Sequence, residues 1–230
     1  MQNENEKVVN SNKNFLRTTI PDIVIKLDGK SYALKDLKKN FLGSGIERFV
    51  FIDPRNSKRV IKISMRSYCK QTREESRYFS FLKSRKVPFT HLPKYYGYFE
   101  GENYIGLCQE LLLNEDGSRP KPMIEWCRKD PSQAEDLLVE LFAFLYRYNV
   151  LSRDSTLDSN IVVVENHKTF GYRCKLIDGL YCGARIPLNK YVKFFGRGSI
   201  KRQFYRNVAW VFSSPDDVWA RIVAKAREKN

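Results

Sequence analysis

Two glycines one residue apart precede an apolar segment with strand propensity, in the sequence FLGSGIERFVF from Phe41 to Phe51. Glycine lets a chain bend sharply and leaves backbone amides unobstructed, so Gly43, Ser44 and Gly45 could cradle phosphate groups. The same glycine spacing is also common in ordinary turns. Other residues must therefore decide whether this loop has chemical partners.

A lysine lies inside the strand expected next along the chain. Lys62 interrupts an otherwise apolar segment, where its ammonium group could point toward phosphates under the glycine loop. On the helix expected after it, Glu75 precedes Tyr78, Phe79 and Leu82 by three, four and seven residues and so shares their apolar face. A carboxylate on an apolar face needs a partner, and Lys62 is the available cation. A lysine on the wet side of a half-buried strand would show the same pattern.

Two oxygen donors stand at the ends of two later strands. Asn160 precedes the apolar segment Ile161–Val164, and Asp178 follows the segment Cys174–Ile177. If these strands pair, the amide and carboxylate oxygens could share one Mg²⁺, a hard cation that keeps water and phosphate oxygens as its other ligands. Each residue taken singly is also an ordinary turn residue.

The elements that would position these residues follow from hydrophobic periodicity and turn residues. The strands expected in the first half are Asp22–Leu27, Ser31–Leu34, Arg48–Asp53, Arg59–Ser64, Tyr95–Glu100 and Tyr104–Glu110. The expected helices are Arg66–Lys83, a long apolar helix behind a capping box at Ser132–Glu135, and two closing helices at Ser199–Phe212 and Pro215–Arg227.

The composition is that of a soluble globular protein. With 230 residues, of which 42% are hydrophobic, the chain can build one domain or two lobes around a real core. The sequence has no apolar run long enough to span a bilayer, and its polar first residues lack a signal-peptide core, so we expect a cytoplasmic protein without a membrane span. The five cysteines have no C-x-x-C spacing, which favours free, buried thiols in a reducing compartment.

The formal net charge of +15 favours an acidic partner. Residues 183–230 carry eleven Lys and Arg against three acidic residues. Nucleic acid, an anionic membrane surface and phosphorylated ligands would all suit such a charge. Four aromatic residues are interleaved with these cations, as in proteins that bind single-stranded nucleic acid, but large apolar side chains are mostly buried, so we expect them in the core. They are Tyr191, Phe194, Phe195 and Tyr205.

The order of these features resembles that of protein kinases: glycine loop, strand lysine, helix glutamate, Asp/Asn loop and strand-end Asp-Gly. Gly43, Gly45 and Val50 match positions one, three and eight of the kinase motif G-x-G-x-x-G-x-V. Among kinase-like proteins, the chain most resembles the bacterial YrbL-type family, which is associated with the PhoP regulatory network. The segments that carry this resemblance are VIKIS, REESRYFSFL, PKYYGYFE, LDSNIVV and KLIDGL.

The resemblance covers about residues 40 to 182 and implies an α+β, two-lobed protein-kinase-like fold. The antiparallel β N-lobe would comprise residues 15–110, and the short, mainly helical C-lobe residues 111–230. Residues 1–14 are polar, and we expect them to be disordered.

The resemblance also implies a binding site for ATP and Mg²⁺. Lys62 would bind the α- and β-phosphates under the loop of Gly43, Ser44, Gly45 and Val50, and Glu75 would orient it. Glu110–Leu112 would be the hinge that meets adenine. Asn160 and Asp178 would hold Mg²⁺, and Asp154 would be the catalytic base.

Two features depart from the kinase pattern. Arg48 stands where the third glycine belongs, and its side chain could itself reach a phosphate. In the kinase catalytic loop the Asp and Asn are five residues apart, whereas Asp154 is six before Asn160 and Ser155 occupies the fifth position. Asp154 could act from a one-residue bulge, or Ser155 could replace it in an inactive pseudokinase. Asp158 is a second candidate carboxylate.

The segment after Asp178 is short, with 52 residues and no A-P-E motif, so we expect no typical platform for a peptide substrate. The favoured function is transfer of the γ-phosphoryl group of Mg-ATP to an unidentified acceptor, with Asp154 orienting its hydroxyl. One alternative is a pseudokinase that binds nucleotide and regulates a partner protein. Another is nucleic-acid binding by the basic C-lobe, which is possible but not favoured. An acidic or phosphorylated acceptor or a regulatory protein would suit the positive charge.

Overall fold

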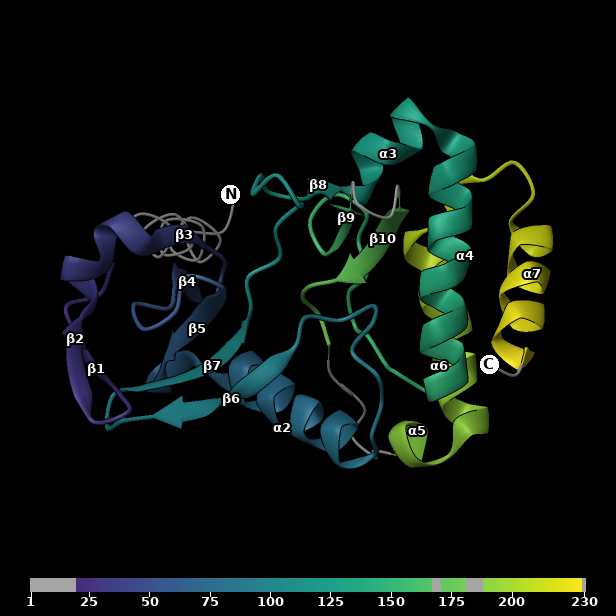
Figure 1. Cartoon of the computed structure of the whole chain (residues 1–230). Helices are drawn as coiled ribbons and strands as arrows, with labels where there is room; N and C mark the ends of the chain where they lie inside the picture. The colour runs from purple at the N-terminus through teal and green to yellow at the C-terminus, as the bar shows by residue number, and fades with distance from the viewer. Residues whose placement is uncertain (1–19, 167–170, 181–187, 229–230) are drawn as a thin grey trace, which may run out of the picture. The chain divides into compact units, whose positions relative to one another are not determined.

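The computed structural model describes residues 20–166, 171–180 and 188–228, and the chain divides into two compact units (Figure 1). The first unit is formed by Met1–Arg77 and Lys94–Leu111, the second by Tyr78–Pro93 and Leu112–Asn230. Antiparallel sheets dominate the first unit and helices the second, which confirms the α+β class. The segment 1–14, which we expected to be disordered, lies outside the described residues.

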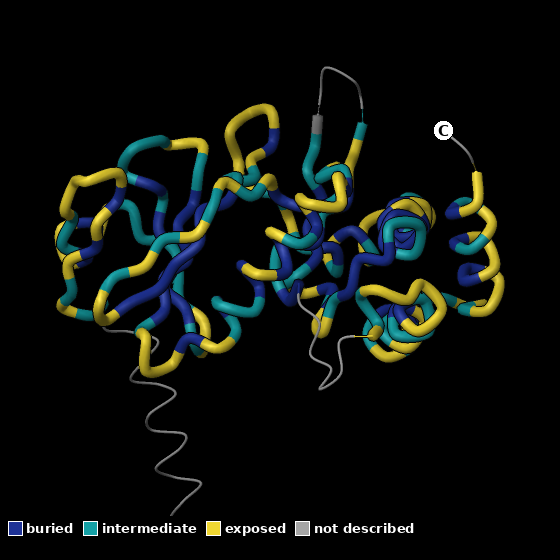
Figure 2. The backbone as a smooth tube through the Cα atoms, turned by 90° about the horizontal axis from the view of Figure 1, so that it is seen from below, coloured by how far each residue is buried: buried dark blue, intermediate teal, exposed yellow. Residues whose placement is uncertain are grey.

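A five-stranded antiparallel sheet forms the framework of the first unit, in the order β3-β4-β5-β7-β6. Its strands are β3 Phe41–Ser44, β4 Phe49–Ile52, β5 Arg59–Met65, β6 Tyr95–Glu100 and β7 Tyr104–Glu110. The central strands β5 and β7 are buried along nearly their whole length, as the dark blue tube of Figure 2 shows. Because both faces of β5 are covered, Lys62 lies inside the protein and is only 8% exposed.

One face of this sheet packs on a hairpin and a short 3₁₀ segment. The hairpin consists of β1 Val24–Leu27 and β2 Lys30–Ala33, and η1 Leu34–Asn40 follows it. Its turn residues Asp28 and Gly29 both have positive φ, +48° and +79°, the backbone that a two-residue hairpin turn requires. The apolar cluster under the hairpin contains Ile25, Leu27, Leu34, Leu37, Phe49, Phe51, Ile61 and Ile63.

Helix α2 Lys70–Ser84 supplies the carboxylate of Glu75. It begins four residues later than the sequence pattern predicts, because Arg66–Tyr68 form a separate 3₁₀ turn, η2. Glu75, Tyr78, Phe79 and Leu82 are all buried, as their helical spacing predicts.

The second unit is built around α4 Pro131–Tyr148 and a small antiparallel sheet in the order β10-β9-β8. The strands are β8 Lys121–Pro122, β9 Ile161–Asn166 and β10 Gly171–Leu176. The other helical elements are α3 Met123–Lys129, α5 Leu188–Tyr191, α6 Lys193–Asn207, η4 Ala209–Val211 and α7 Pro215–Arg227. Nine residues of α4 are buried, which makes this helix the centre of the unit's core.

The predicted capping box at Ser132–Glu135 is wrong. The side chain of Asp130 caps α4 by accepting a hydrogen bond of 3.0 Å from the Gln133 amide. Pro131 occupies the first turn, where its fixed φ suits a helix start and its missing amide costs nothing. Glu135 instead pairs with Arg221 of α7. The sequence pattern also misses α3 and α5, and it starts α6 six residues too late.

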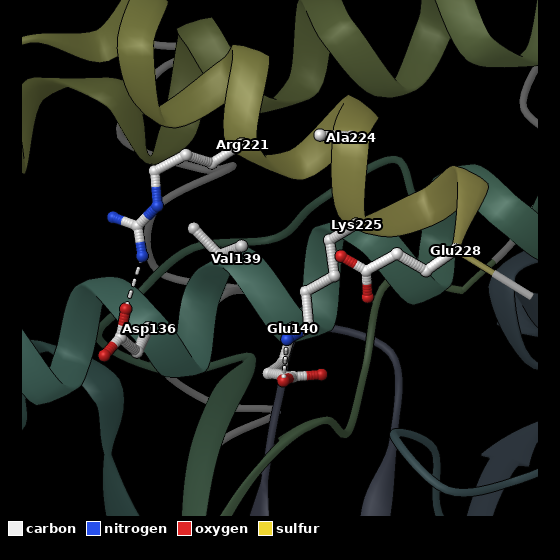
Figure 3. A pocket seen from close by; sticks show the side chains of 7 residues that line it. All are labelled: Asp136, Val139, Glu140, Arg221, Ala224, Lys225 and Glu228. Carbon is white, nitrogen blue, oxygen red and sulfur yellow. Dashed lines mark hydrogen bonds and ion pairs between the residues drawn. The ribbon is translucent and has the colours of Figure 1, made fainter. Parts of the chain in front are cut away.

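Ion pairs join α4 to α7 around a shallow pocket of about 450 Å³ (Figure 3). Arg221 pairs with Glu135 and, at 2.5 Å, with Asp136, and Lys225 Nζ lies 2.5 Å from Glu140 Oε1. Tyr146 of α4 packs edge-on against Trp219 of α7 next to these pairs. Since both basic side chains of the pocket already have carboxylate partners, it serves the packing of the two helices.

No helix of the described chain is long and apolar enough to cross a membrane. The four cysteines within the described residues are free thiols, and three of them are buried. Burial raises the pKa of the Cys174 thiol well above its usual value and that of Cys108 to about 12, so neither is a thiolate at neutral pH. Cys182 lies outside the described residues.

The buried imidazole of His91 predicts a pH dependence of stability. Its Nδ1 donates a hydrogen bond of 2.8 Å to the Cys174 carbonyl oxygen. Burial lowers the pKa of His91, and this hydrogen bond offsets the effect only in part. As the pH falls below about 6.5, His91 becomes protonated in the unfolded chain but stays neutral in the folded protein. The free energy of unfolding therefore falls with the pH until the pH reaches the pKa of His91 in the folded protein.

Urea unfolding at about pH 7.5 and about pH 5.5 measures this loss. In His91→Gln, the difference between the free energies of unfolding at the two pH values should become smaller. The control is His167→Gln, since the sequence has two histidines. If His91→Gln kept the full pH dependence and His167→Gln abolished it, the assignment to His91 would be wrong.

Candidate functional site

The segment FLGSGIERFVF forms a tight hairpin between β3 and β4. Gly43 pairs with Val50 and Ser44 with Phe49, and the Gly45 amide donates a hydrogen bond of 2.8 Å to the Arg48 carbonyl oxygen. No atom lies within 4 Å of the point where a Cβ on Gly43 or Gly45 would stand. The backbone of this loop is therefore open on that side, as contact with a phosphate requires.

Three sequence-predicted residues lie in one row across the sheet. Gly43 on β3 is opposite Val50 on β4, and Val50 is opposite Lys62 on β5. Directly opposed residues of antiparallel strands project to the same face. Phe49, Phe51, Ile61 and Ile63, which alternate with them, belong to the apolar cluster on the other face. The register thus places Val50 and Lys62 on the face that does not carry the hairpin core.

Glu75 is the centre of a buried ion cluster. Its Oε1 lies 3.7 Å from Lys62 Nζ and accepts a hydrogen bond of 3.4 Å from Gln109 Nε2, and its Oε2 pairs with the Arg48 guanidinium. Glu75 is 1% exposed and Arg48 5% exposed. The structure thus joins Lys62 to Glu75 and adds a second cation. The cluster therefore places two basic side chains beside the carboxylate of Glu75.

Arg48 and its neighbour Glu47 both hold the glycine hairpin on helix α2. The Glu47 carboxylate accepts hydrogen bonds from the amides of Gln71 at 3.0 Å and Thr72 at 2.9 Å, and so caps the helix. The sequence gives no signal for this cap, because Glu47 lies 24 residues before Gln71. The position of Arg48 in place of a third glycine is therefore explained by the ion pair with Glu75.

The expected hinge, Glu110–Leu112, lies where the first unit ends. The Glu110 amide donates to the Lys94 carbonyl oxygen at 2.9 Å, and the Leu111 amide donates to the Lys58 carbonyl oxygen at 3.0 Å. Both amides are thus engaged within the first unit. An adenine at this segment would have to use the Leu112 amide or the carbonyl groups.

In the second unit, backbone hydrogen bonds bring together the three polar residues predicted for chemistry. The Asn160 side-chain amide donates to the Asp154 carbonyl oxygen at 3.3 Å, and Asn160 O accepts from the Ile177 amide at 2.8 Å. The Arg153 amide donates to the Gly179 carbonyl oxygen at 2.8 Å. The loop of Asp154 is therefore bound on one side to Asn160 and on the other to the residues around Asp178.

Of the two adjacent candidates, Asp154 is exposed to solvent and Ser155 is not. Ser155 is fully buried, and its Oγ lies 3.4 Å from the Asn207 side-chain amide. Asp154 is exposed. The extra residue in this loop is accommodated by turning the serine into the core. Asp158 is also exposed and accepts a hydrogen bond of 3.3 Å from the Ser159 hydroxyl, so it stays in reach of solvent as the second carboxylate.

Asn160 and Asp178 supply an amide and a carboxylate oxygen, the donor set of a magnesium site completed by phosphate and water. Within the described ranges, no group of three or more His, Cys, Asp or Glu side chains could hold a metal ion. One amide and one carboxylate oxygen would suit only a cation that brings most of its ligands with it, as Mg²⁺ commonly does. One oxygen of Asp178 accepts a hydrogen bond of 2.6 Å from the Gly179 amide, which orients the carboxylate.

Gly179 is the residue on which the Asp154 and Asp178 loops meet, so its substitution should disrupt both. Its φ is +75°, and a Cβ would lie 2.2 Å from the Asp154 carbonyl oxygen. We expect Gly179→Ala to lower the free energy of unfolding by about 1–3 kcal/mol, measured by urea denaturation. The control is Gly198→Ala in α6, where a Cβ would meet no atom of the described residues within 4 Å. This substitution should raise the free energy of unfolding by about 0.5–1 kcal/mol, because alanine favours a helix over glycine. Equal effects of the two substitutions would contradict the close packing.

Removal of the Arg48 guanidinium should leave the buried Glu75 with Lys62 as its cationic partner. We expect Arg48→Met to lower the free energy of unfolding by about 1–3 kcal/mol, because the buried Oε2 of Glu75 loses its charged hydrogen-bond donor. In the control, Lys35→Met removes the exposed pair of Lys35 and Asp22, 2.6 Å apart, at a cost below about 1 kcal/mol. Chemical denaturation measures both, and a loss at Arg48 no larger than at Lys35 would contradict the role of the cluster.

Comparisons with known proteins were made for the sequence and for the fold. The family model described as PhoP regulatory network protein YrbL matches residues 34–211. Among solved structures, the BubR1 kinase domain is similar, with 14% sequence identity and a TM-score of 0.47. That match covers 70% of this chain and 50% of the BubR1 domain, so the chain spans about half the length of that domain. No curated protein gave a significant match. Because the family model matches well over half of the chain, the protein belongs to the YrbL family of the PhoP regulatory network.

Proposed function

We propose that this protein binds ATP with Mg²⁺ and transfers the γ-phosphoryl group to an acceptor hydroxyl. The observation that carries the proposal is the arrangement of the Asp154 loop. Backbone hydrogen bonds join it to Asn160 and to Gly179, while Ser155 is turned into the core. A loop that only made a turn would not need the exposed carboxylate of Asp154 next to Asn160 and Asp178, whose side-chain oxygens could bind a metal ion.

The first unit would bind the triphosphate. The open glycine backbone offers amides, and Lys62, in the same row across the sheet as Gly43 and Val50, offers a cation to the α- and β-phosphates. Glu75 would position Lys62, since its Oε1 lies 3.7 Å from the ammonium group. The nearby Arg48 guanidinium adds positive charge to the cluster around Glu75. This arrangement supports binding by charge and orientation, which phosphoryl transfer chiefly requires.

The second unit would position the acceptor. Asp154 would accept a hydrogen bond from the acceptor hydroxyl and hold its oxygen in line with the phosphoryl group. Asn160 and Asp178 would hold Mg²⁺. When bound, this ion would neutralise the charge that develops on the transferred group and its leaving oxygen. The hydrogen bond from Asn160 to the Asp154 carbonyl oxygen supports a fixed geometry between the two.

Calorimetry with ATP, with and without Mg²⁺, tests the binding step. We expect binding that requires Mg²⁺ and is weakened about tenfold or more in Lys62→Ala and in Asp178→Asn, because each substitution removes a charged contact to the triphosphate or its metal. Lys58→Ala serves as a control, since this lysine is exposed in the turn that precedes β5. If the folded wild-type protein did not bind ATP, the proposal would be wrong.

Phosphoryl release from ATP, measured with an acceptor mixture of small hydroxyl compounds, tests the second step. Asp154→Asn should slow turnover by about 10²- to 10⁴-fold and leave ATP affinity unchanged, because a positioned base acts on the transition state. Asp158→Asn is the matched control, since it makes the same change in the same loop and should keep activity. The reverse ranking would assign the base to Asp158.

A pseudokinase that binds nucleotide without turnover is the second candidate. The ion pair of Arg48 with Glu75 favours it, because Arg48 competes with Lys62 for the carboxylate that would orient the lysine. Binding of Mg-ATP that is intact in Asp154→Asn, together with turnover indistinguishable between wild type and this variant, would establish the pseudokinase.

A further inference from the structure

An exposed apolar patch covers α5 and the first turn of α6. Phe194 is 80% exposed and Phe195 50% exposed, and Tyr191 is exposed beside them. The expectation that Tyr191, Phe194 and Phe195 belong to the core is therefore wrong, whereas the fourth aromatic residue, Tyr205, is half-buried against Phe204 and Trp219. Helix α6 buries Gly196, Ile200 and Phe204, which are spaced by four residues, so the two phenylalanines before them point to solvent.

The same surface is strongly basic. The sequence has no acidic residue between Asp178 and Asp216, while six cations lie between residues 190 and 206. They are Lys190, Lys193, Arg197, Lys201, Arg202 and Arg206. A patch that combines exposed aromatic side chains with uncompensated positive charge marks an interaction site, because both features cost free energy in an isolated protein.

Part of this basic and aromatic surface lines a groove of about 540 Å³ between α6 and the ends of α4 and α7. Phe194 and Phe195 lie along it with Arg197, Lys201 and Arg202. Within the described part of the chain, the buried Nε of Arg197 has no hydrogen-bond partner. The contrast with the pocket between α4 and α7 is informative, because there each basic side chain already has a carboxylate partner. In the groove, by contrast, Arg202 donates a hydrogen bond of 3.1 Å to Ser199 Oγ, and Arg197 and Lys201 lie over the rings of Tyr146 and Tyr205. Within the described residues, none of these three cations pairs with a carboxylate.

The composition of the patch favours a protein over a single-stranded nucleic acid. Nucleic acids stack their bases on aromatic faces and gain little from aliphatic side chains. Leu188 and Val192 extend the patch, with exposed fractions of 49% and 40%, and aliphatic groups of this kind pack well in protein interfaces. In addition, the Lys190 ammonium group already lies over the rings of Phe81 and Tyr191, at 5.0 and 4.8 Å. It is therefore engaged with aromatic rings of its own chain.

We propose that this groove is a docking site for an acidic, amphipathic segment of a partner protein. The apolar side chains of the segment cover Phe194 and Phe195, which act as anchors. Its carboxylates pair with Lys201 and Arg202, which gives the interaction its charge selectivity. The groove lies wholly in the second unit, and docking there does not require nucleotide binding. This proposal is therefore independent of the proposed phosphoryl transfer.

Selection from a displayed library of random peptides tests the proposal with the full-length protein. Peptides are selected on the wild type and counter-selected on the double variant Phe194→Ala/Phe195→Ala. We expect the enriched peptides to carry an excess of Asp and Glu around apolar residues. A synthetic peptide of the enriched sequence should bind the double variant about tenfold or more weakly, because two anchors are lost. Lys201→Gln/Arg202→Gln should weaken binding several-fold and flatten its dependence on salt.

Two controls match these variants. Lys38→Gln/Lys39→Gln removes an adjacent, exposed pair of cations from the first unit, and Tyr68→Ala removes an exposed aromatic ring there, so both should bind the peptide as the wild type does. Circular dichroism checks that each variant stays folded.

Three outcomes would overturn the assignment. One is enrichment of peptides without acidic residues, and another is equal binding by the variants of the groove and of the first unit. The third is a preference of the groove for a single-stranded oligonucleotide or for vesicles of anionic lipid over every enriched peptide.

Discussion

A carboxylate held inside the protein must keep its charge partners, and Glu75 imposes this constraint on the whole first unit. Three elements supply partners to this residue of helix α2: Arg48 from the glycine hairpin, Lys62 from β5 and Gln109 from β7. Unpaired, the charge would be too costly to bury, so hairpin, sheet and helix are fixed together. The capping of α2 by Glu47 acts in the same direction, since it binds the tip of the hairpin to the start of the helix.

In the second unit, close backbone contacts and hydrogen bonds position the residues predicted for chemistry. Gly179 approaches the Asp154 carbonyl oxygen so closely that no side chain fits between them. This contact and the bonds of Asn160 set the positions of a carboxylate, an amide and a second carboxylate. Rigid backbone positions are what a site for metal-assisted chemistry needs, because the donor oxygens must be preorganised before the ligand arrives.

The positive charge of the chain serves different purposes in different places. Around Glu75 it is buried and compensated, and between α4 and α7 it is paired on the surface. Along α6 it lies beside exposed phenylalanines, with no acidic residue in the sequence from 179 to 215. Net charge alone cannot distinguish these three situations, although only the last one offers attraction to an acidic partner.

The sequence by itself determined most strands of the first unit and the presence of helix α2, because alternation and helical periodicity there agree with local propensity. It did not reveal strand β3 or the 3₁₀ segment η1, whose residues lack a clear periodic pattern. The order of Gly43, Lys62, Glu75, Asn160 and Asp178 also sufficed to predict the kinase-like fold, and segments such as VIKIS and KLIDGL sufficed to predict the YrbL family. Only the tertiary structure decided that Arg48 pairs with Glu75, that Ser155 is buried while Asp154 is exposed, and that Phe194 and Phe195 lie on the surface. Each of these depends on partners far away in the sequence, and a local pattern does not contain the charge or the packing that such partners supply.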